Sequence, residues 1–286
     1  MKILCWNLNN RISNQRAWDI IVDFDPDIAL LSEVNYVPER LPGYEIVLEY
    51  ATGHNGRPRN FKTCILIKGR VEGIIDLVAH EEWVNAGLRA FPGNFIARRV
   101  SLNDGEKLNV ISVHMPSWPF PYREFTEGDV SAVMLPGYWQ MHMSELLWAA
   151  LRRTMPLIGG NWIVGGDFNT SEFIGSTKTQ NDANREVIDR MRRLGFIEAV
   201  REVSGGPMPS WRSSRPGAKL RHQLDHLYVS DGLRHRMLAA RIGAPDKYFP
   251  MQLSDHLPLF AEFESLSQGV PMMSVAPEIT ARTSCT

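Results

Sequence analysis

The amino-acid sequence predicts one α/β domain built of two stacked mixed β-sheets with helices on the outside. Three observations support this prediction. Strand, helix and strand patterns follow one another within residues 1–33, as in a right-handed crossover unit. Strand-like runs separated by Gly and Asn turns fill residues 44–112, and two more such runs come late in the chain. No internal repeat or shift of composition divides these segments, so one domain is expected over residues 1–264.

The N-terminal segment contains the predicted crossover unit. Lys2–Trp6 has the continuous apolar pattern of a buried strand. A helix is expected between Ser13 and Asp25, where apolar residues recur at helical spacing, and Pro26 ends it. A second buried strand, Ile28–Leu31, follows directly.

The middle of the chain contains further strands and one long loop. The turn Asn103–Glu106 joins two strand-like runs into an expected antiparallel hairpin. A loop rich in Pro and aromatic residues is expected over Pro116–Tyr138, followed by a helix over Trp139–Arg153. The strand-like runs are Tyr44–Tyr50, Thr63–Gly69, Phe95–Leu102 and Lys107–Met115.

The C-terminal part supplies the remaining elements. A short buried strand is expected at Trp162–Val164 and a helix over Asn184–Leu194. Two late strands are expected at Gln223–Ser230 and His256–Phe263. Beyond them the Ser, Pro, Gln and Thr content rises and periodicity ends, so Ser265–Thr286 is expected to form a mobile tail.

The overall composition excludes several classes of protein. Of 286 residues 44% are hydrophobic and 22% are charged, and the formal net charge is −1, so no global basic field indicates nucleic acid or membrane. Cys5, Cys64 and Cys285 form no pair of zinc-binding spacing. No apolar run has the length of a signal peptide or a membrane span, so a cytoplasmic location without a membrane anchor is expected. An anionic ligand must therefore be bound locally, by clustered arginines or a metal.

Polar side chains suited to metal or phosphate chemistry follow several of the apolar runs. Each has a structural explanation when taken alone: Glu33 as a solvated strand end, His114 as a core-edge imidazole, and Asp255 as a helix N-cap. Six separate elements deliver such a residue, which makes coincidence a poor account of the whole set. These residues are Asn7, Glu33, His114, Asp167, Asp225 and the pair Asp255 and His256.

The segment Trp162–Asn169, WIVGGDFN, raises the question of why a buried strand should end in a carboxylate. Ligands gather at the carboxyl ends of strands in α/β sheets, which is where Asp167 is expected. If the backbone stays extended, Asp167 and Asn169 point to one side and Phe168 points back into the core. An Asx turn, in which Asp167 only caps the loop, is the alternative.

Together these motifs resemble those of the endonuclease/exonuclease/phosphatase superfamily, which includes pancreatic deoxyribonuclease and the abasic-site endonucleases. The similarity runs from about Lys2 to Phe263. It implies a four-layered α/β sandwich and Mg²⁺-dependent cleavage of phosphate esters, with Mn²⁺ as a possible substitute. The motifs are WNLNN with Asn7, ALLSEV with Glu33, SVHMPSW with His114, GGDFNT with Asp167 and Asn169, QLDHLYVS with Asp225, and SDHLPLF with Asp255 and His256.

The resemblance implies a metal site made of hard oxygen ligands, which suit Mg²⁺. Glu33 is the first expected metal ligand, with Asp255 and Asn7 as further ligands. Asn9 stands where some family members carry a second aspartate. This chain therefore has one negative charge fewer at that position, and Asn9 is assigned to the substrate side.

The resemblance also implies the roles of the remaining motif residues. Asp167 is expected to orient and deprotonate the attacking water, and Asn169 to hold that water or the phosphate. His114 and His256 are expected to donate hydrogen bonds to the phosphoryl oxygens. Asp225 is expected to pair with one of the two imidazoles, most simply that of His256, and to favour its protonated form.

Two basic segments, 57–62 and 211–222, both expected in loops, indicate the substrate. Arginines interleaved with aromatic rings suit a nucleic-acid strand, so a nuclease acting on DNA or RNA is the first prediction. A phosphatase or phosphodiesterase of a small or lipid phosphate ester is the second, and a non-catalytic binding module is the third. The expected substrate-binding residues in these segments are Arg57, Arg59, Trp211, Arg212 and Arg215.

The aromatic residues of the long loop after His114 have two interpretations. Trp118, Phe120, Tyr122 and Phe125 form either a wall that faces bases or lipid, or a cluster that packs on itself under the loop. The sequence favours neither.

Overall fold

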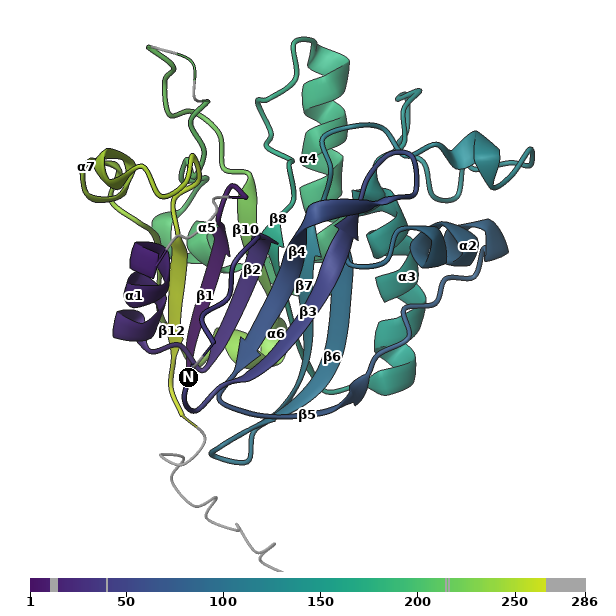
Figure 1. Cartoon of the computed structure of the whole chain (residues 1–286). Helices are drawn as coiled ribbons and strands as arrows, with labels where there is room; N and C mark the ends of the chain where they lie inside the picture. The colour runs from purple at the N-terminus through teal and green to yellow at the C-terminus, as the bar shows by residue number, and fades with distance from the viewer. Residues whose placement is uncertain (11–14, 40, 214, 216, 266–286) are drawn as a thin grey trace, which may run out of the picture.

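The computed structural model describes residues 1–10, 15–39, 41–213, 215 and 217–265, and they form two six-stranded mixed sheets packed face to face (Figure 1). The first sheet has the order β11–β12–β1–β2–β4–β3 and the second the order β5–β6–β7–β8–β10–β9. The strands of the first sheet are β1 (Lys2–Asn7), β2 (Ile28–Val34), β3 (Glu45–Thr52), β4 (Pro58–Ile67), β11 (Met237–Ile242) and β12 (Leu259–Phe263). Those of the second sheet are β5 (Gly69–Ile74), β6 (Phe95–Leu102), β7 (Lys107–His114), β8 (Asn161–Asp167), β9 (Phe196–Glu198) and β10 (Asp225–Ser230).

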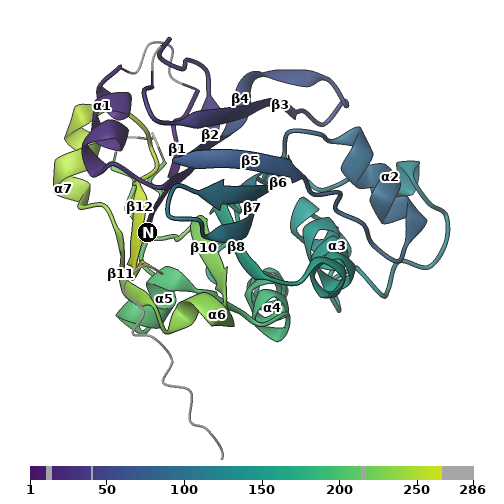
Figure 2. The same ribbon diagram turned by 90° about the horizontal axis from the view of Figure 1, so that it is seen from below.

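Helices cover the outer faces of both sheets (Figure 2). Helices α1 and α7 lie on the side of the first sheet, and α3 and α4 lie on the side of the second. The helices are α1 (Gln15–Phe24), α2 (Glu82–Ala90), α3 (Met143–Ile158), α4 (Lys178–Arg193), α5 (Ala199–Ser204), α6 (Asp231–Arg234) and α7 (Pro245–Tyr248), with short 3₁₀ turns η1 (Tyr122–Glu124) and η2 (Phe249–Met251). None of the described helices is long and apolar enough to cross a membrane.

Three apolar layers hold the four structural layers together, which confirms the predicted α/β sandwich. The layer between the sheets contains Cys5, Leu30, Ile65, Ile163 and Leu227. The layer under α1 contains Leu4, Trp6, Trp18 and Ile21, and the layer under α3 and α4 contains Ile111, Leu147, Leu151, Trp162 and Met191. The continuous apolar runs of β1, β2 and β8 are explained by this arrangement, because both faces of each strand are buried.

The predicted strands and helices agree with the structure in type but differ at several boundaries. Helix α3 begins at Met143 rather than Trp139 because the Glu145 carboxylate accepts a hydrogen bond from the backbone N–H of His142, and this contact fixes the first turn. Helix α4 begins six residues earlier than expected because Thr177 caps a polar first turn. The sequence patterns did not predict β5, β9, β11, α2 and the short helices α5 to α7. The predicted tail 265–286 lies outside the described residues except for Ser265, and so does Ser13 at the expected start of α1.

Arg190 in α4 anchors the long loop after β7. Its guanidinium is buried and donates hydrogen bonds to the carbonyl oxygens of Val133 (2.5 Å) and Met134 (3.0 Å). It also lies 4.2 Å from the centre of the Trp148 ring. The loop, α3 and α4 are therefore tied together at one cation.

We expect Arg190→Met to lower the free energy of unfolding by about 2 to 4 kcal/mol, because two buried carbonyl groups lose their donors. Thermal and urea unfolding measure the effect. Arg192→Met is the matched control, since Arg192 lies two residues further along α4 with an exposed side chain. Equal stability of the two variants would contradict the anchoring role of Arg190.

Candidate active site

The register of the second sheet brings three polar residues together at one end. Strands β7 and β8 run parallel with His114 opposite Asp167, so their carboxyl ends coincide. Strand β10 runs antiparallel to β8 with Asp225 opposite Asp167, so the first residue of β10 joins them. Three neighbouring strands thus place an imidazole and two carboxylates at the same end of the sheet.

The first sheet supplies a second set of polar residues at the same end, which is at the top of Figure 1. Strands β1 and β2 run parallel with Asn7 opposite Ser32, which places Asn7 beside Glu33. Strand β12 runs antiparallel to β1, so Asp255 and His256, which precede β12, lie at this end too. Stacking of the two sheets therefore brings both sets together.

Two glycines before Asp167 allow this close stacking. A β-carbon on Gly165 would lie 2.8 Å from the sulfur of Cys5 in the first sheet. One on Gly166, whose φ is +132°, would lie 2.2 Å from the carbonyl oxygen of Val113 in β7. Only glycine leaves room for both approaches, which explains the GG of the WIVGGDFN segment.

Glu33 leaves the regular geometry of its strand. Its φ is +52°, and it lies at a bulge in the pairing of β2 with β4 between Leu31 and Val34. A positive φ at a residue other than glycine costs about 1 to 3 kcal/mol, and bulges commonly redirect side chains beside active sites. The bulge turns the Glu33 carboxylate into the cleft described below.

Asp167 and Asn169 are joined by an Asx turn, so the expected extended backbone is wrong at this point. Asn169 has a φ of +47°, and its backbone N–H donates to Oδ1 of Asp167 at 2.9 Å. Its side-chain nitrogen donates to Oδ2 of Asp167 at 3.1 Å and to the carbonyl oxygen of Met115 at 2.6 Å. Phe168 is buried, as expected. Asp167 therefore lies at the end of strand β8 and also accepts the hydrogen bond of an Asx turn. The turn holds the side chains of Asp167 and Asn169 beside the cleft.

Asn7 links the two sheets beneath the cleft. Its amide nitrogen donates to Oε1 of Glu33 at 3.1 Å and to Oδ2 of Asp167 at 2.9 Å. Its amide oxygen accepts from the backbone N–H of Asn9 at 2.8 Å. In this geometry Asn7 positions two carboxylates, and its role as a metal ligand, which would need the oxygen to turn toward the cleft, stays a prediction.

The expected pairing of Asp225 with His256 is confirmed. Nδ1 of His256 lies 2.8 Å from Oδ2 of Asp225, and the hydroxyl of Ser210 donates to the same oxygen at 2.7 Å. Burial alone would lower the pKa of His256, but the charges of Asp225 and Asp167 outweigh it and raise the pKa to about 10. The imidazole is therefore protonated at neutral pH.

We expect His256→Gln to lower the stability of the metal-free protein by about 3 kcal/mol near pH 6.5, because it leaves buried carboxylates without their cation. The folded-state pKa of His256 lies above its unfolded value, so its contribution is complete below pH 6.5 and is lost as the pH rises through about 10. Urea unfolding in EDTA at pH 6, 8 and 10 measures the difference in free energy of unfolding between the unaltered protein and His256→Gln. This difference should become smaller as the pH rises. His235→Gln, at an exposed position, is the control. A difference that stays constant across this range would contradict the charge assignment.

The two central carboxylates have opposite pKa shifts. Burial raises the pKa of Asp167 to about 6, opposed by the positive charge of His256 and reinforced by the negative charge of Asp225. Burial also acts to raise the pKa of Glu33, but the hydrogen bond and charge of His114 outweigh it and hold that pKa below its usual value. Glu33 is thus ionised throughout the neutral range, whereas Asp167 titrates close to the pH at which a general base works best.

An open cleft with about 770 Å³ of empty space lies over these groups. The predicted residues that line it are Asn9, Glu33, Arg59, His114, Asp167, Asn169, Trp211, Asp255 and His256. Asn7 and Asp225 are buried beneath it. Arg57, Arg212 and Arg215 are exposed outside the lining. The structure therefore brings together the predicted reaction chemistry but only part of the predicted substrate surface.

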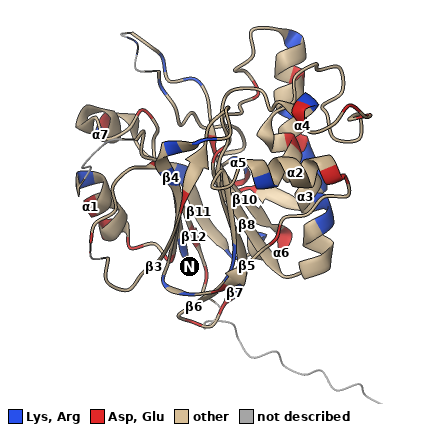
Figure 3. Ribbon diagram, turned by 45° about the vertical axis from the view of Figure 1, so that its right-hand side comes forward, with Lys and Arg blue, Asp and Glu red and all other residues tan. Residues whose placement is uncertain are grey.

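The first basic segment, 57–62, was wrongly expected in a loop. Most of it forms the start of β4, which is drawn with basic residues in Figure 3. The first three residues of β4, through Asn60, are exposed, and burial begins at Phe61. The strand points Arg59 toward the cleft and stacks its guanidinium 5.1 Å from the centre of the Phe61 ring.

Several residues of the site were not predicted from the sequence. Ser254 accepts a hydrogen bond from the backbone N–H of His256 (3.0 Å) and donates to the carbonyl oxygen of Asn7 (2.6 Å). Ser210 fixes Asp225, as described above. Ser254 belongs to the SDH motif and was detectable there, whereas Ser210 has no local signal because a loop brings it to Asp225. Further cleft residues not assigned from sequence are Thr52, Phe61, Pro116 and Ser117.

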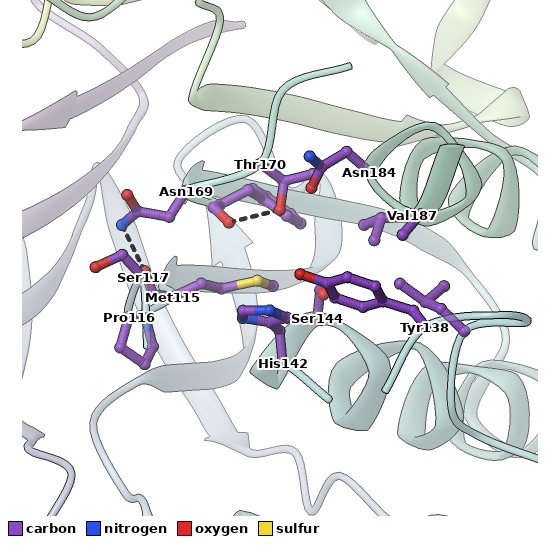
Figure 4. Close-up of a pocket in the computed structure, with 13 residues that line it drawn as sticks. Met115, Pro116, Ser117, Tyr138, His142, Ser144, Asn169, Thr170, Asn184 and Val187 are labelled. Carbon is purple, nitrogen blue, oxygen red and sulfur yellow. Dashed lines mark hydrogen bonds between the residues drawn. The ribbon is translucent and has the colours of Figure 1, made fainter. Parts of the chain in front are cut away.

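A second, narrower pocket adjoins the cleft behind Asn169 (Figure 4). It shares Pro116, Ser117 and Asn169 with the cleft and has about 420 Å³ of empty space. Polar side chains from the long loop and from α4, including those of Tyr138 and Asn184, face its interior. The Asx turn therefore separates the cleft from this second pocket, and Asn169 lines both.

The donor atoms of the cleft fit a divalent cation. Ligand atoms of Glu33, His114 and Asp167 lie within 4.8 Å of one another, and those of Asp167, Asp225 and His256 do so as well. Among the described residues Asp255 belongs to neither cluster, although it lines the cleft and accepts from the indole N–H of Trp211 at 3.2 Å. Carboxylate oxygens are the ligands that Mg²⁺ and Mn²⁺ prefer.

The two-sheet sandwich with paired carboxylates and imidazoles at one end defines a class of phosphoric ester hydrolases. The model of the "Endonuclease/Exonuclease/phosphatase family" matches residues 4–256, so the chain belongs to this family. The family assignment and the enzyme class predicted from the motifs are thereby confirmed. No sequence relative was found among curated proteins.

Solved structures with the same fold are similar to this chain at low sequence identity. The catalytic domain of Xenopus laevis APE2 has a TM-score of 0.64 at 19% identity, covering 92% of this chain and 91% of that one. The 3'-5' exonuclease NExo from Neisseria meningitidis has a TM-score of 0.61 at 18% identity, covering 93% and 100%. The AP endonuclease LMAP from Leishmania major has a TM-score of 0.60 at 18% identity, covering 92% and 87%.

Proposed function

We propose that this protein is a Mg²⁺- or Mn²⁺-dependent nuclease that hydrolyses phosphodiester bonds of DNA or RNA. The observation that carries the proposal is the convergence of Asp167, Glu33 and His256 in one open cleft, with Asp225 paired to His256 beneath it. A metal-supported hydrolysis needs these three functions: a base, an anionic metal ligand and a cationic donor.

The metal would be held by Glu33, with Asp255 as a further expected ligand. When bound, the cation polarises the phosphoryl group and neutralises charge on the leaving oxygen. Nε2 of His114 lies 3.5 Å from Oε1 of Glu33, so the imidazole and the cation would both lie beside this carboxylate.

The residues of the chain divide the remaining steps. Asp167 takes the proton of the attacking water at Oδ1 or Oδ2. Asn169 is fixed by the Asx turn, and its side-chain nitrogen donates to Asp167 and Met115, so its amide oxygen accepts from that water and holds it in line. The protonated His256 donates to a phosphoryl oxygen as negative charge increases in the transition state. Asp225 keeps that imidazole protonated and fixes its orientation through Nδ1.

Both basic segments contribute to the cleft, which favours nucleic acid over a small ester. Arg59 and Trp211 line it, and the backbone N–H of Arg212 donates to the carbonyl oxygen of Asp255. The guanidinium of Arg212 stacks 4.0 Å from the centre of the Phe249 ring. Among proteins of this fold, the 3' phosphatase NExo from Neisseria has been solved bound to a product DNA hairpin. A nucleic-acid strand would contact cations and rings on both sides of the reacting phosphate.

The test is to incubate the purified protein with Mg²⁺ or Mn²⁺ and with single- and double-stranded DNA, RNA, bis(p-nitrophenyl) phosphate and p-nitrophenyl phosphate. We expect cleavage of a nucleic acid that EDTA abolishes. Cleavage of the small esters alone would overturn the nuclease and support the second candidate, a phosphatase or phosphodiesterase of a small or lipid phosphate. The cytoplasmic location expected from the sequence remains a separate proposal.

A further inference from the structure

The long loop after β7 and the residues before α3 form a groove beside the cleft, with about 670 Å³ of empty space. We call it the aromatic ledge. Its exposed ring is Trp139, whose side chain is 75% accessible, and the ring of Tyr122 is half-buried. The residues that line it are His54, Pro119, Phe120, Pro121, Tyr122, Arg123, Trp139, Gln140 and Met141.

The ledge continues the catalytic cleft. Trp118 lines the cleft, and its ring packs edge-on against that of His54 with centroids 5.0 Å apart. His54 in turn lines the ledge. A ligand that extends past Trp118 therefore passes from the reacting groups directly onto the aromatic surface.

A packed core under the ledge keeps it in place. Phe120 stacks on Phe125 with ring centroids 5.1 Å apart, and it contacts Phe91 at 5.7 Å. The backbone N–H of Phe120 donates to the carbonyl oxygen of Met141 at 2.7 Å, which joins the two chain segments that form the ledge. Both interpretations of the loop aromatics thus hold in part. Phe120 and Phe125 stack on each other in the core, whereas Trp118 and Tyr122 pack against that core with one side and line the cleft and the ledge, respectively, with the other. Trp139 is left exposed by this core.

The charges around the ledge restrict what it can bind. Arg123 is exposed beside the ring of Tyr122, at 5.7 Å from its centroid. The exposed acidic residues Glu124, Glu127 and Asp129 follow on the same loop. This acidic stretch disfavours the dense phosphates of a duplex or of an anionic membrane. Unpaired bases present apolar faces that stack on aromatic rings without regard to sequence.

We propose that the aromatic ledge binds unpaired nucleotides of the strand whose phosphate lies in the cleft, so that single-stranded or tailed nucleic acid is the preferred substrate. This inference rests on the proposed nuclease function. Trp139 supplies the main stacking surface, with Tyr122 beside it, and Trp118 with His54 connects that surface to the reacting phosphate.

The experiment compares duplex DNA that carries a six-nucleotide 3' or 5' tail with the same blunt duplex. For the unaltered protein we expect the KM of either the 3'-tailed or the 5'-tailed duplex to be about tenfold below that of the blunt duplex. Stacking of one base on an aromatic ring typically changes affinity by about this factor. Trp139→Ala should remove that advantage and Trp139→Phe should retain most of it. Leu238→Ala, an exposed apolar position on β11, is the control and should keep the preference. Thermal unfolding verifies that each variant is folded.

Several outcomes would contradict the proposal that the ledge binds unpaired nucleotides and would leave the nuclease proposal unaffected. Equal KM values for tailed and blunt substrates would do so, as would a Trp139→Ala effect of the same size on both. Binding of phosphatidylserine vesicles that Trp139→Ala abolishes, with no effect of tails, would assign the ledge to a lipid surface instead. If no nucleic acid is cleaved at all, fluorescence anisotropy of a labelled single-stranded oligonucleotide in EDTA still tests the ledge, since Trp139→Ala should weaken that binding about tenfold.

Discussion

Asp167→Asn is expected to reduce turnover by about a thousandfold or more while leaving the protein folded. A positioned general base contributes about a hundredfold to ten-thousandfold, and the amide cannot accept the proton of the attacking water. The size of the side chain is unchanged, and the oxygen that accepts the backbone N–H of Asn169 is retained. Steady-state kinetics with saturating Mg²⁺ measure the loss.

The stability of this variant distinguishes a lost base from a lost fold. The folded-state pKa of Asp167 is raised to about 6, mainly by burial, so the ionised carboxylate destabilises the folded metal-free protein above that pH. The neutral amide removes this cost, but its NH2 group takes the place of Oδ2 and faces the side-chain nitrogens of Asn7 and Asn169, which lose their acceptor. We therefore expect a cooperatively unfolding protein with a Tm in EDTA at pH 8 only slightly below that of the unaltered protein. Asp182→Asn, an exposed carboxylate on α4, is the matched control for both measurements. Near-normal turnover of Asp167→Asn would show that another group is the base.

Glu33→Gln is expected to weaken Mn²⁺ binding by at least about tenfold and to lower kcat/KM by about a thousandfold at fixed metal concentration. The carboxylate is ionised at neutral pH because the hydrogen bond and charge of His114 outweigh its burial. The glutamine keeps the shape but not the charge that holds the cation. Isothermal titration with Mn²⁺ reports metal binding independently of activity.

A matched control keeps this test specific. Glu39→Gln removes an exposed carboxylate from the segment that follows the same strand and should change neither quantity. Raising the Mn²⁺ concentration should recover part of the activity of Glu33→Gln, because the remaining donors of the cleft still bind the ion. Unchanged Mn²⁺ affinity in Glu33→Gln would contradict the proposal that Glu33 binds the metal.

The sequence was most informative where a residue type and a strand end coincide. Asp167 after a buried apolar run predicted a polar residue at the sheet end, and the motif order placed Glu33, His114 and His256 beside it. Helix α4 shows the opposite case: its first turns are polar, so no apolar periodicity marked where it begins. Strand β5, with Gly69 and Gly73, was missed because edge strands have weak apolar patterns.

The interpretation of polar residues depended on contacts that sequence does not encode locally. Arg190 has the pattern of a helix-end cation, yet it is buried because the loop carrying Val133 folds over it. Asn7 was expected only to bind metal, and the structure shows in addition that its amide bridges Glu33 and Asp167 from opposite sheets. Each arrangement joins positions far apart in the chain.

The sequence by itself determined the α/β class and the family, because strand periodicity and ordered motifs are local properties of the chain. The roles of the residues in the reaction stay predictions from the same motifs. Only the tertiary structure decided how those residues act together. The register that sets Asp167 opposite both His114 and Asp225, the bulge that turns Glu33, and the packing that buries Phe120 while leaving Trp139 exposed all depend on pairing between distant segments. Their free energy comes from burial and hydrogen bonds formed after the chain has closed, which no local pattern records.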